Sequence, residues 1–508
     1  MDHQLVLVVD FGGQYTQLIV RRVRELGVYS EMVPWQKAEQ AIRDRGPDAV
    51  ILSGGPKSVL EPGAPTIDVS VLDNIPTLGI CYGLQVMAHR GGGCVESSSE
   101  REYGHRHLTS IAPNSLVAKM ADPAVWMSHG DRVVKIPDGS IITATTATCP
   151  VAAFENAANK HYGVQFHPEV SHTPSGRSIL HSFLFDIAGL RGDWTTANFI
   201  EESIQRIKEE VGDEQVLCAV SGGVDSSVVA ALMTKALGHQ VKCVFVDHGL
   251  LRKGEAEQVV KTFTEVFHPN LILINAHDQF FGALKGVTEP EAKRKAIGEQ
   301  FVVCFERHRD DLSDCKFLAQ GTLYPDVIES GSPTAAKIKT HHNVGGLPDW
   351  MRLQVVEPLR WLFKDEVREV GRQLGLPDDV VDRQPFPGPG LGVRILGEVT
   401  PERVAIVQDA DHIFREELRV QGLEAGIWQS YAALLDVRSV GVMGDERTYE
   451  QPIVLRAVQS EDAMTARAVP LEFSFLEHVA HRIVNEVKGV NRVLYDLTSK
   501  PPATIEWE

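Results

Sequence analysis

The chain has 508 residues, of which 43% are hydrophobic and 23% charged, as is typical of a folded globular protein. Fibrous and low-complexity classes are therefore excluded. Fifty Lys and Arg residues against 68 Asp and Glu residues give a formal charge of −18, which disfavours a nucleic-acid partner but permits a local basic pocket for a nucleotide. At roughly 150 residues per domain, this length favours about three domains.

The N-terminal apolar run at 5–9 has acidic neighbours, so we expect a core strand there and not a signal peptide. No apolar stretch approaches the roughly 18 residues needed to span a bilayer, and we expect no membrane partner. The seven cysteines are scattered and show no paired spacing, which favours neither a disulfide framework nor a structural zinc site. The expected compartment is the reducing cytoplasm.

The first 193 residues alternate short apolar runs with turns and helical patterns. LVLVV at 5–9, AVIL at 49–52 and TLGI at 77–80 predict strands of a largely parallel sheet in an α/β domain. A helical pattern at 198–212 follows a polar stretch and ends at Gly212, a residue suited to a helix C-terminus. We place the first domain boundary near residue 193.

A cysteine, a histidine and a carboxylate are the first candidate site. Cys81 follows the TLGI run and precedes a helical pattern, a context that exposes a thiol at a helix N-terminus and favours its thiolate. His167 and Glu169 are two residues apart, and in an extended segment that spacing brings both side chains to one sheet face. This combination suits acyl transfer through a thioester, with Gly54 and Gly55 as candidate backbone donors to an oxyanion.

Five motifs in this segment, DFGGQYTQLIVRRVRE, LSGGP, GICYGLQ, WMSHGD and GVQFHPEV, resemble those of the class I glutamine amidotransferases and occur in the same order. The resemblance implies that Cys81 attacks the glutamine amide, that His167 serves as base and then acid, and that Glu169 orients His167. It also implies a glutamine pocket, which is lined by Gly54, Gly55, Gln85, Ser128, His129 and Asp131.

From residue 216 a second alternation begins, with apolar runs VLCAV, VKCVFV and LILI separated by helical patterns. These are successive strand–helix–strand units, which predict a second open, largely parallel α/β sheet. The run RQPFPGPGL at 383–391 holds three prolines and two glycines, so neither a helix nor a central strand continues through it. We expect this domain at 194–383 and a smaller α+β domain at 384–508.

The segment SGGVDSS at 221–227 joins the first of these strands to a helix, where backbone N–H groups and hydroxyls can face an anion. It lacks the lysine of the Walker pattern. The Asp225 carboxylate suits Mg²⁺, which takes oxygen ligands. The segment resembles the loop of ATP pyrophosphatases with an adenine nucleotide alpha hydrolase-like fold, which implies cleavage of ATP between its α- and β-phosphates. The implied ATP contacts are Ser221, Gly222, Gly223, Val224, Asp225, Ser226 and Ser227, with Mg²⁺ at Asp225.

Further segments resemble the GMP synthetase family. They are GVTEPEAKRKAIG at 286–298, FLAQGTLYPDVIES at 317–330, IKTHHNVGGLP at 338–348, and the C-terminal RQPFPGPGLGVR, GVMGDERTYEQPIVLRAV and YDLTSKPPATIEWE. The resemblance implies a C-terminal domain that forms a homodimer and helps to bind xanthosine monophosphate (XMP). The implied XMP contacts are Arg294, Arg383, Lys500, Ile505 and Glu506. Around Arg467 the sequence departs from the family pattern.

The resemblance covers nearly the whole chain and implies an enzyme that converts XMP, ATP and L-glutamine into GMP, AMP and pyrophosphate. An asparagine synthetase would use an N-terminal cysteine, whereas residue 2 here is Asp. An RNA-thiolating enzyme could share the phosphate loop, but the charge of −18 argues against an RNA partner. A nucleotide-binding regulator without catalysis is opposed by the intact Cys81, His167 and Glu169.

Overall fold

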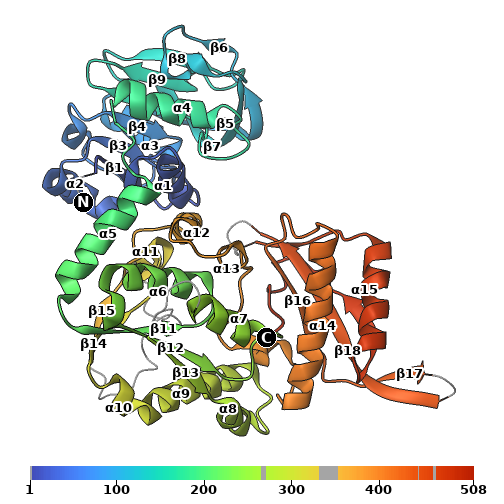
Figure 1. Cartoon of the computed structure of the whole chain (residues 1–508). Coiled ribbons are helices and arrows are strands. Elements are labelled where there is room, and N and C mark those ends of the chain that lie inside the picture. The colour runs from blue at the N-terminus through green and yellow to red at the C-terminus, as the bar shows by residue number, and fades with distance from the viewer. Residues whose placement is uncertain (1–2, 265–269, 331–352, 444–445, 461–464) are drawn as a thin grey trace. The chain divides into compact units, whose positions relative to one another are not determined.

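The computed structural model describes the chain apart from residues 1–2, 265–269, 331–352, 444–445 and 461–464. It divides into two compact units, Met1–Phe199 and Ile200–Glu508 (Figure 1). Helix α5 (Thr196–Val211) contains the point of division, and it ends next to Gly212 as predicted. The domain boundaries near 193 and 383 stay predictions.

The first unit is built on an eight-stranded sheet in the order β2-β1-β3-β4-β10-β9-β8-β6. The first five strands in this order are parallel, and the remaining three pair antiparallel. The three apolar runs predicted as strands are confirmed as β1, β3 and β4. The strands are β1 (Leu5–Asp10), β2 (Tyr29–Pro34), β3 (Ala49–Leu52), β4 (Thr77–Ile80), β6 (Ser110–Ile111), β8 (Ile141–Thr145), β9 (Ala153–Asn156) and β10 (His161–Val164).

Helices cover the parallel part of this sheet, which explains why its strands are apolar on both faces. Residues of α2 and α3 share a buried cluster with Leu7 and Val9 of β1, while the alternate residues Val6 and Val8 are equally buried. The helices are α1 (Thr16–Glu25), α2 (Trp35–Arg45), α3 (Tyr82–Arg90) and α4 (Gly176–His181).

A separate antiparallel pair, β5 (Cys94–His107) and β7 (Ala124–Lys135), was not predicted from the sequence. Its register sets Glu102 opposite His129 and Tyr103 opposite Ser128. This pair therefore carries the WMSHGD motif to the turn that holds Cys81.

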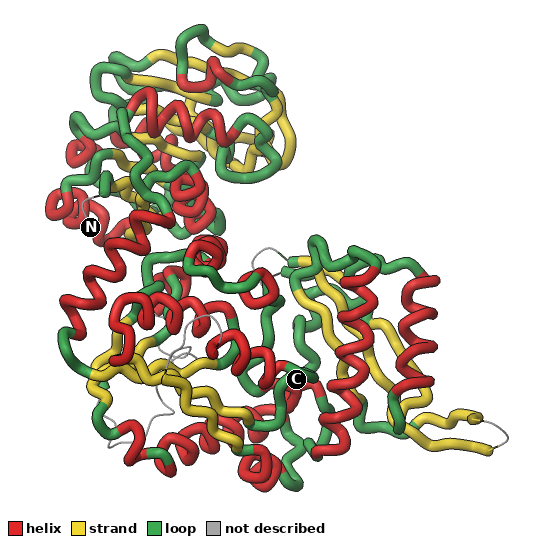
Figure 2. The backbone as a smooth tube through the Cα atoms, in the orientation of Figure 1, coloured by secondary structure: helices red, strands yellow, loops and turns green. Residues whose placement is uncertain are grey.

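The second unit contains a five-stranded, all-parallel sheet in the order β13-β12-β11-β14-β15. The chain runs outward from β11 to β13 and returns to β14, so the strand order reverses beside β11, the usual place for a ligand in such sheets. Helices lie on both faces (Figure 2). The elements are β11 (Gln215–Val220), α6 (Val224–Leu237), β12 (Val241–Asp247), α7 (Glu255–Thr262), β13 (Asn270–Asn275), α8 (His277–Leu284), α9 (Pro290–Arg307), α10 (Arg309–Leu312), β14 (Cys315–Ala319), α11 (Tyr324–Ser330), β15 (Gln354–Val356), α12 (Lys364–Gln373) and α13 (Asp378–Val381).

The C-terminal part of the second unit is a smaller α+β region, as predicted. Its elements are α14 (Pro401–Val420), β16 (Gln429–Leu434), β17 (Ser439–Met443), β18 (Glu446–Gln459), β19 (Arg467–Ala468), α15 (Phe473–Glu486) and β20 (Val490–Tyr495). Helices α14 and α15 pack against the sheet, and β17 with the start of β18 forms a projecting ribbon (Figure 1). One buried apolar cluster includes residues from Leu217 to Val490, so it spans both parts of this unit.

Among the described helices, none combines the length and the apolar character that a bilayer crossing requires.

Candidate active sites

Cys81 lies at a sharp strand-to-helix turn. It follows β4 directly, precedes the first residue of α3, and has φ 52° and ψ −102°. The turn is closed by two backbone hydrogen bonds, from Cys81 N–H to the Val164 carbonyl at 2.8 Å and from Gly83 N–H to the Ser53 carbonyl at 3.0 Å. A Cβ atom on Gly83 would lie 2.3 Å from the Leu52 carbonyl oxygen, so only glycine permits this approach. The predicted position of Cys81 at a helix N-terminus is confirmed, but the expected exposure is wrong, because Cys81 is only 4% exposed.

His167 and Glu169 lie close together, but not on a strand. Strand β10 ends at Val164, His167 lies in irregular chain and Glu169 lies in a turn, so the expected extended spacing is wrong. Pro168 between them has no N–H group to donate to a neighbouring strand. Nδ1 of His167 nevertheless lies 2.7 Å from Oε1 of Glu169. The Thr173 hydroxyl holds this turn by donating to the His167 carbonyl at 2.7 Å.

The electrostatics of this trio favour the protonated imidazole of His167. Burial lowers the pKa of His167, but the negative charge of Glu169 and the Cys81 sulfur outweigh it and raise the pKa well above its usual range. The Cys81 sulfur also receives a hydrogen bond from Nε2 of Gln165 at 3.6 Å and lies 3.6 Å from the Ser128 carbonyl oxygen. The arrangement can therefore hold a nucleophile beside a proton carrier and its orienting carboxylate.

The loop after β3 faces the same pair. A Cβ atom on Gly54 would lie 3.0 Å from Cε1 of His167 and 3.9 Å from Cβ of Cys81. At Gly55 a Cβ atom would meet the Tyr82 ring at 3.1 Å. The structure thus brings both glycines of this loop to the thiol-bearing turn.

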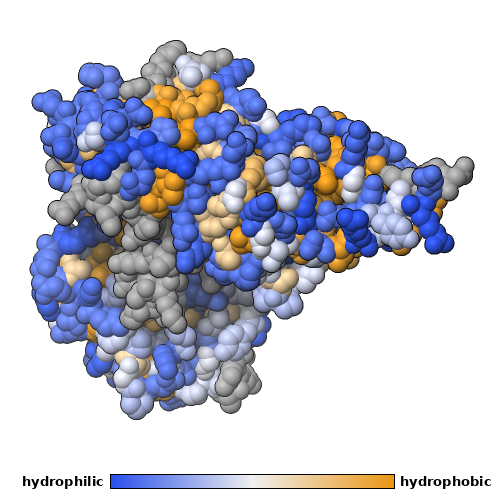
Figure 3. Space-filling model, turned by 90° about the horizontal axis from the view of Figure 1, so that it is seen from below, coloured by the Kyte–Doolittle hydropathy of each residue, from blue (hydrophilic) through white to orange (hydrophobic). Residues whose placement is uncertain are grey.

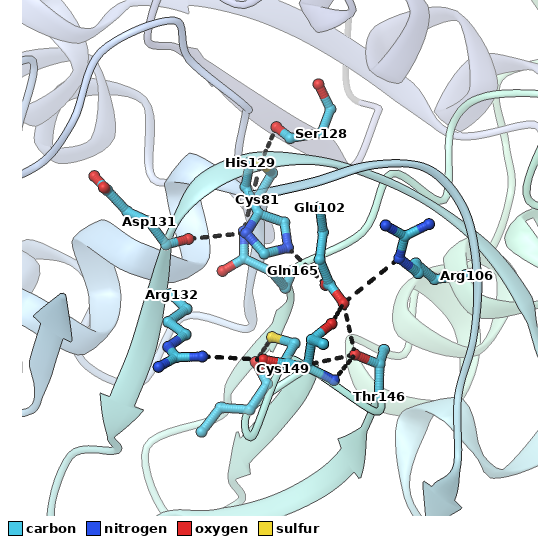
Figure 4. Close-up of polar contacts among 12 residues, drawn as sticks. Cys81, Glu102, Arg106, Ser128, His129, Asp131, Arg132, Thr146, Cys149 and Gln165 are labelled. Carbon is cyan, nitrogen blue, oxygen red and sulfur yellow. Dashed lines mark hydrogen bonds and ion pairs between the residues drawn. The ribbon is translucent and has the colours of Figure 1, made fainter. Parts of the chain in front are cut away.

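The remaining predicted glutamine-pocket residues come from α3 and β7 (Figure 4). The Gln85 amide donates to the Asp131 carbonyl at 2.9 Å, and the Ser128 carbonyl faces the Cys81 thiol. The His129 ring is buried and points to Glu102 of β5, with Nε2 lying 3.2 Å from Oε2. The four residues are grouped around Cys81 chiefly through backbone carbonyls.

The predicted phosphate loop lies at the carboxyl end of β11. Gly222 has φ 77°, and Ser221 and Ser226 are joined by their hydroxyls at 3.0 Å. The Ser226 hydroxyl also accepts from Ser221 N–H at 3.1 Å. With Val224 and Ser227 in the first turn of α6, the loop can present N–H groups and hydroxyls to an anion.

A cavity of about 720 Å³ opens at this loop. Apolar residues of the parallel sheet and the two aromatic rings Phe301 and Phe305 of α9 line it, together with the cations Lys364, Arg368 and Arg383. Such a mixture suits a nucleotide, with apolar walls for a base and cations for phosphates.

Asp225 and Gly222 each contact one of these cations. Both carboxylate oxygens of Asp225 lie 2.6 Å from Nζ of Lys364. Nη1 of Arg383 donates to the Gly222 carbonyl at 2.6 Å, and Nη2 pairs with the buried Glu255. Asp225 alone among the loop residues offers a carboxylate, which fits Mg²⁺ because this ion commonly takes one or two carboxylates and completes its shell with phosphates and waters.

The residues predicted to contact XMP fall into two groups. Arg383 lies at the phosphate loop, whereas Arg294, Ile505 and Glu506 gather where the C-terminal tail meets α9 and β18. Nη2 of Arg294 donates to the Glu508 carbonyl at 2.7 Å. The backbone of Lys500 pairs with Ala466.

Buried arginines hold the C-terminal tail. Arg394 donates through Nη2 and Nε to the two oxygens of Glu506, at 2.9 and 3.1 Å. The Ile505 carbonyl accepts from Nε of Arg456 and from the Tyr431 hydroxyl, both at 2.8 Å. Phe386 lies under the guanidinium groups of both Arg394 and Arg383, at 5.0 and 5.8 Å, and so links the tail to the phosphate loop.

Three family models match the chain. They are Glutamine amidotransferase class-I at residues 7–187, GMP synthase C terminal domain at 416–507, and tRNA methyl transferase HUP domain at 214–263. A glutamine-hydrolysing GMP synthase of Carboxydothermus hydrogenoformans is 57% identical over 505 residues and is matched over 99% of both chains. The enzyme of that name from Clostridium perfringens is 55% identical over 506 residues, again with 99% of both chains matched.

The chain belongs to the family of glutamine-hydrolysing GMP synthases. The resemblance seen in its motifs is thereby confirmed, as are the α/β fold class and the assignment to glutamine-dependent ligases that make GMP. The match over residues 214–263 adds an independent indication that β11, α6 and β12 form a nucleotide-binding fold of the HUP type.

Sequence reasoning missed several residues of the two sites. Gln165 belongs to the GVQFHPEV motif, so the sequence offered a signal for its position beside the thiol. Arg394 ends the RQPFPGPGLGVR motif and was likewise signalled by the sequence, whereas Lys364 and Glu255 were not. The predicted substrate segment at 338–348, with its neighbour Lys337, lies outside the described residues.

Proposed function

We propose that this protein makes GMP from XMP, ATP and L-glutamine, with release of glutamate, AMP and pyrophosphate. One observation carries the proposal: a single chain holds both the Cys81–His167–Glu169 arrangement and the SGGVDSS loop at a cavity of nucleotide size. Either feature alone fits several enzyme classes. Together they join an ammonia source to a reaction that activates an acceptor with ATP.

In the proposed glutaminase, the Cys81 thiolate attacks the glutamine carboxamide carbon. His167, held by Glu169, donates its proton to the leaving nitrogen, so ammonia departs and a glutamyl thioester remains. His167 then takes a proton from water as the water attacks the thioester, which releases glutamate and restores the thiol. Backbone N–H groups around Gly54 and Gly55 are the proposed donors to the oxyanion.

In the proposed synthetase, the 2-carbonyl oxygen of XMP attacks the α-phosphorus of ATP and expels pyrophosphate. Ammonia then adds to the activated carbon and AMP leaves, because an adenylylated oxygen is a far better leaving group than the free carbonyl oxygen. The loop at 221–227 binds the pyrophosphate portion of ATP, with Lys364 and Arg383 supplying positive charge. Mg²⁺, carried with ATP and held at Asp225, would supply further neutralisation of the phosphates.

XMP is proposed to bind between the phosphate-loop cavity and the C-terminal tail. Arg294, Arg383, Lys500, Ile505 and Glu506 are the proposed contacts. Support comes from the buried arginines that fix the tail and from Phe386, which joins the tail to the cavity. A tail fixed in this manner can present a carboxylate and backbone groups to a purine nucleotide.

We also propose that the protein is a homodimer through its C-terminal region and that it works in the cytoplasm. Val440 and Val442 of β17 are 53% and 73% exposed, and Leu497 is 74% exposed. Figure 3 shows hydrophobic side chains among hydrophilic ones on this part of the molecule. Seven free thiols fit a reducing compartment.

The deciding assay incubates the protein with Mg·ATP, XMP and glutamine and measures GMP, AMP and pyrophosphate. All three should form in equal amounts. Formation of ADP, or ATP cleavage that is independent of XMP, would overturn the proposal. Cys81→Ala should abolish the use of glutamine but keep amination by ammonium salt, whereas Asp225→Asn should slow both.

The dimer is tested separately by sedimentation equilibrium. Val442→Asp places a charge on the exposed face of β17, and we expect it to shift the mass from two chains toward one. A monomeric wild-type chain at micromolar concentration would contradict the homodimer without touching the catalytic proposal.

A further inference from the structure

A buried carboxylate that the proposed mechanism does not use lies behind the glutamine site. Glu102 is only 2% exposed and belongs to β5. Its Oε1 accepts from the Thr146 hydroxyl at 3.0 Å and also from the Thr148 hydroxyl, while Oε2 lies 3.2 Å from Nε2 of His129. Nε of Arg106 lies 3.7 Å from Oε1 (Figure 4). Glu102 thus ties β5 to β7 and to the loop between β8 and β9.

Hydrogen bonding keeps this carboxyl group charged. Burial alone would raise the pKa of Glu102, but hydrogen bonds from His129, Thr148 and Thr146 outweigh it and lower the pKa to about 2. A charged, buried acceptor imposes strict geometry on its donors, because a lost hydrogen bond leaves part of its charge uncompensated. The three donors are therefore fixed in place by Glu102.

His129 carries this constraint toward the thiol. Its Nδ1 lies 2.9 Å from the Asp131 carbonyl oxygen, which also accepts from the Gln85 amide at 2.9 Å. The carbonyl of the preceding residue, Ser128, lies 3.6 Å from the Cys81 sulfur. Both ring nitrogens of His129 face oxygen atoms, and a neutral ring donates to one of the two.

A metal ion is a weaker explanation of the cluster. Ligand atoms of Glu102, His129 and Cys149 lie within 4.8 Å of one another. However, the carboxylate oxygens already accept hydrogen bonds from two threonines, and Arg106 is adjacent. Burial, together with the negative charge of Glu102, raises the pKa of Cys149 to about 12. Hydrogen bonds satisfy the carboxylate without a cation.

We propose that Glu102 is a positioning residue for glutamine hydrolysis, acting through His129 to fix the segment 128–131 whose carbonyl oxygens contact the Cys81 thiol and Gln85. The inference rests on the proposed glutaminase role of Cys81 and extends it to residues on a different sheet. Among the described residues, no hydrogen bond joins Glu102 to Cys81, His167 or Glu169. We therefore assign Glu102 to the seating of glutamine and not to the ionisation of the thiol.

The test compares Glu102→Gln with wild type in the full chain. Glutamine keeps the size of the side chain but removes its charge and turns one acceptor into a donor that opposes the donors around it. We expect the KM for glutamine to rise at least about 10-fold with a smaller change in kcat, because a misplaced segment weakens binding of the substrate. GMP formation from ammonium salt should be unchanged.

Alkylation of Cys81, followed by mass spectrometry, separates seating from reactivity. A glutamine-shaped diazoketone should label Cys81 about 10-fold more slowly in Glu102→Gln, whereas iodoacetamide should label it at the wild-type rate. Equal slowing with both reagents would show that Glu102 affects the thiol itself and would overturn the positioning role. An unchanged KM in a folded variant would overturn it as well.

Further variants guard against a merely structural effect. Glu155→Gln is the matched control, since Glu155 of β9 also accepts a backbone hydrogen bond, from Leu116 N–H at 2.6 Å, in the same unit. It should leave the KM for glutamine unchanged. If Glu102→Gln fails to fold, Thr148→Val removes one donor from a less buried position, and we expect a smaller rise of a few-fold in the same KM.

A double-variant cycle tests the path through His129. In a His129→Asn background, Glu102→Gln should add little further loss, because the link to 128–131 is already cut. Fully additive effects would contradict that path. If Cys81→Ala kept its use of glutamine, the proposed function itself would fail, whatever Glu102→Gln did, so the two failures are distinguishable.

Discussion

A methyl group at position 54 should disable the glutaminase while sparing the synthetase. A Cβ atom on Gly54 would lie 3.0 Å from Cε1 of His167. Carbon atoms pack at about 3.5–4.0 Å, so the ring must shift by about half an ångström. It cannot follow freely, because Nδ1 is held 2.7 Å from Glu169 and the His167 carbonyl accepts from Thr173 at 2.7 Å. A misplacement of about 1 Å can cost about 100-fold, so we expect Gly54→Ala to lower the glutamine-dependent kcat about 10-fold to 100-fold.

The assay measures GMP formation with saturating glutamine and, in parallel, with ammonium salt. Gly282→Ala in α8 is the control, since no atom of the described residues lies within 4 Å of a Cβ there, and it should leave both rates unchanged. If Gly54→Ala kept the wild-type rate with glutamine, then the position of the His167 ring would not depend on its close contact with Gly54, and the reasoning would be refuted.

Three further predictions concern charged groups. Lys364→Met removes the ammonium group beside Asp225, and we expect the KM for ATP to rise about 10-fold with either glutamine or ammonia as the nitrogen source. The KM is measured from the rate of pyrophosphate release, and an unchanged value would exclude this pair from ATP binding. Arg394→Met leaves Glu506 without its buried partner, so calorimetry should show a loss of about 3–5 kcal/mol in stability, and XMP kinetics a raised KM; no change in either would contradict a fixed tail. The pKa of Glu102 is lowered to about 2 from 4.5, so its stabilisation is complete above about pH 4.5 and is lost as the pH falls toward 2. The difference in urea stability between wild type and Glu102→Gln should therefore shrink on acidification, and a constant difference would count against the charged state.

Much of both sites could be predicted because parallel strands end at a common edge. Gly54, Cys81 and the loop at 221–227 each follow directly on a short apolar run, and the structure has β3, β4 and β11 at those runs. Ligand-binding residues of open α/β sheets gather at such carboxyl ends. Local pattern and motif were therefore sufficient to place Cys81 and the loop at 221–227 at strand-to-helix turns.

The site residues that were not predicted from the sequence depend on contacts between distant parts of the chain, which local sequence pattern does not encode. Lys364 lies 139 residues from Asp225 in the chain, and Glu506 lies 112 residues from Arg394. Glu102 sits within a long antiparallel pair whose apolar alternation gave no strand prediction. For His167, the expected pairing with Glu169 is present, but the extended backbone that was expected for it is not, since β10 ends at Val164 and Glu169 lies in a turn.

The left-handed backbone conformation at Cys81 lowers the stability of the fold at the residue that carries the proposed nucleophile. With φ 52° and ψ −102°, this residue occupies a region that side chains bearing a Cβ atom avoid, at a cost of about 1–3 kcal/mol. Glycine adopts such a conformation without that cost. Cys81→Gly would relieve this backbone strain and would also remove the proposed nucleophile. The strain at the turn therefore accompanies the thiol that the proposed glutaminase requires.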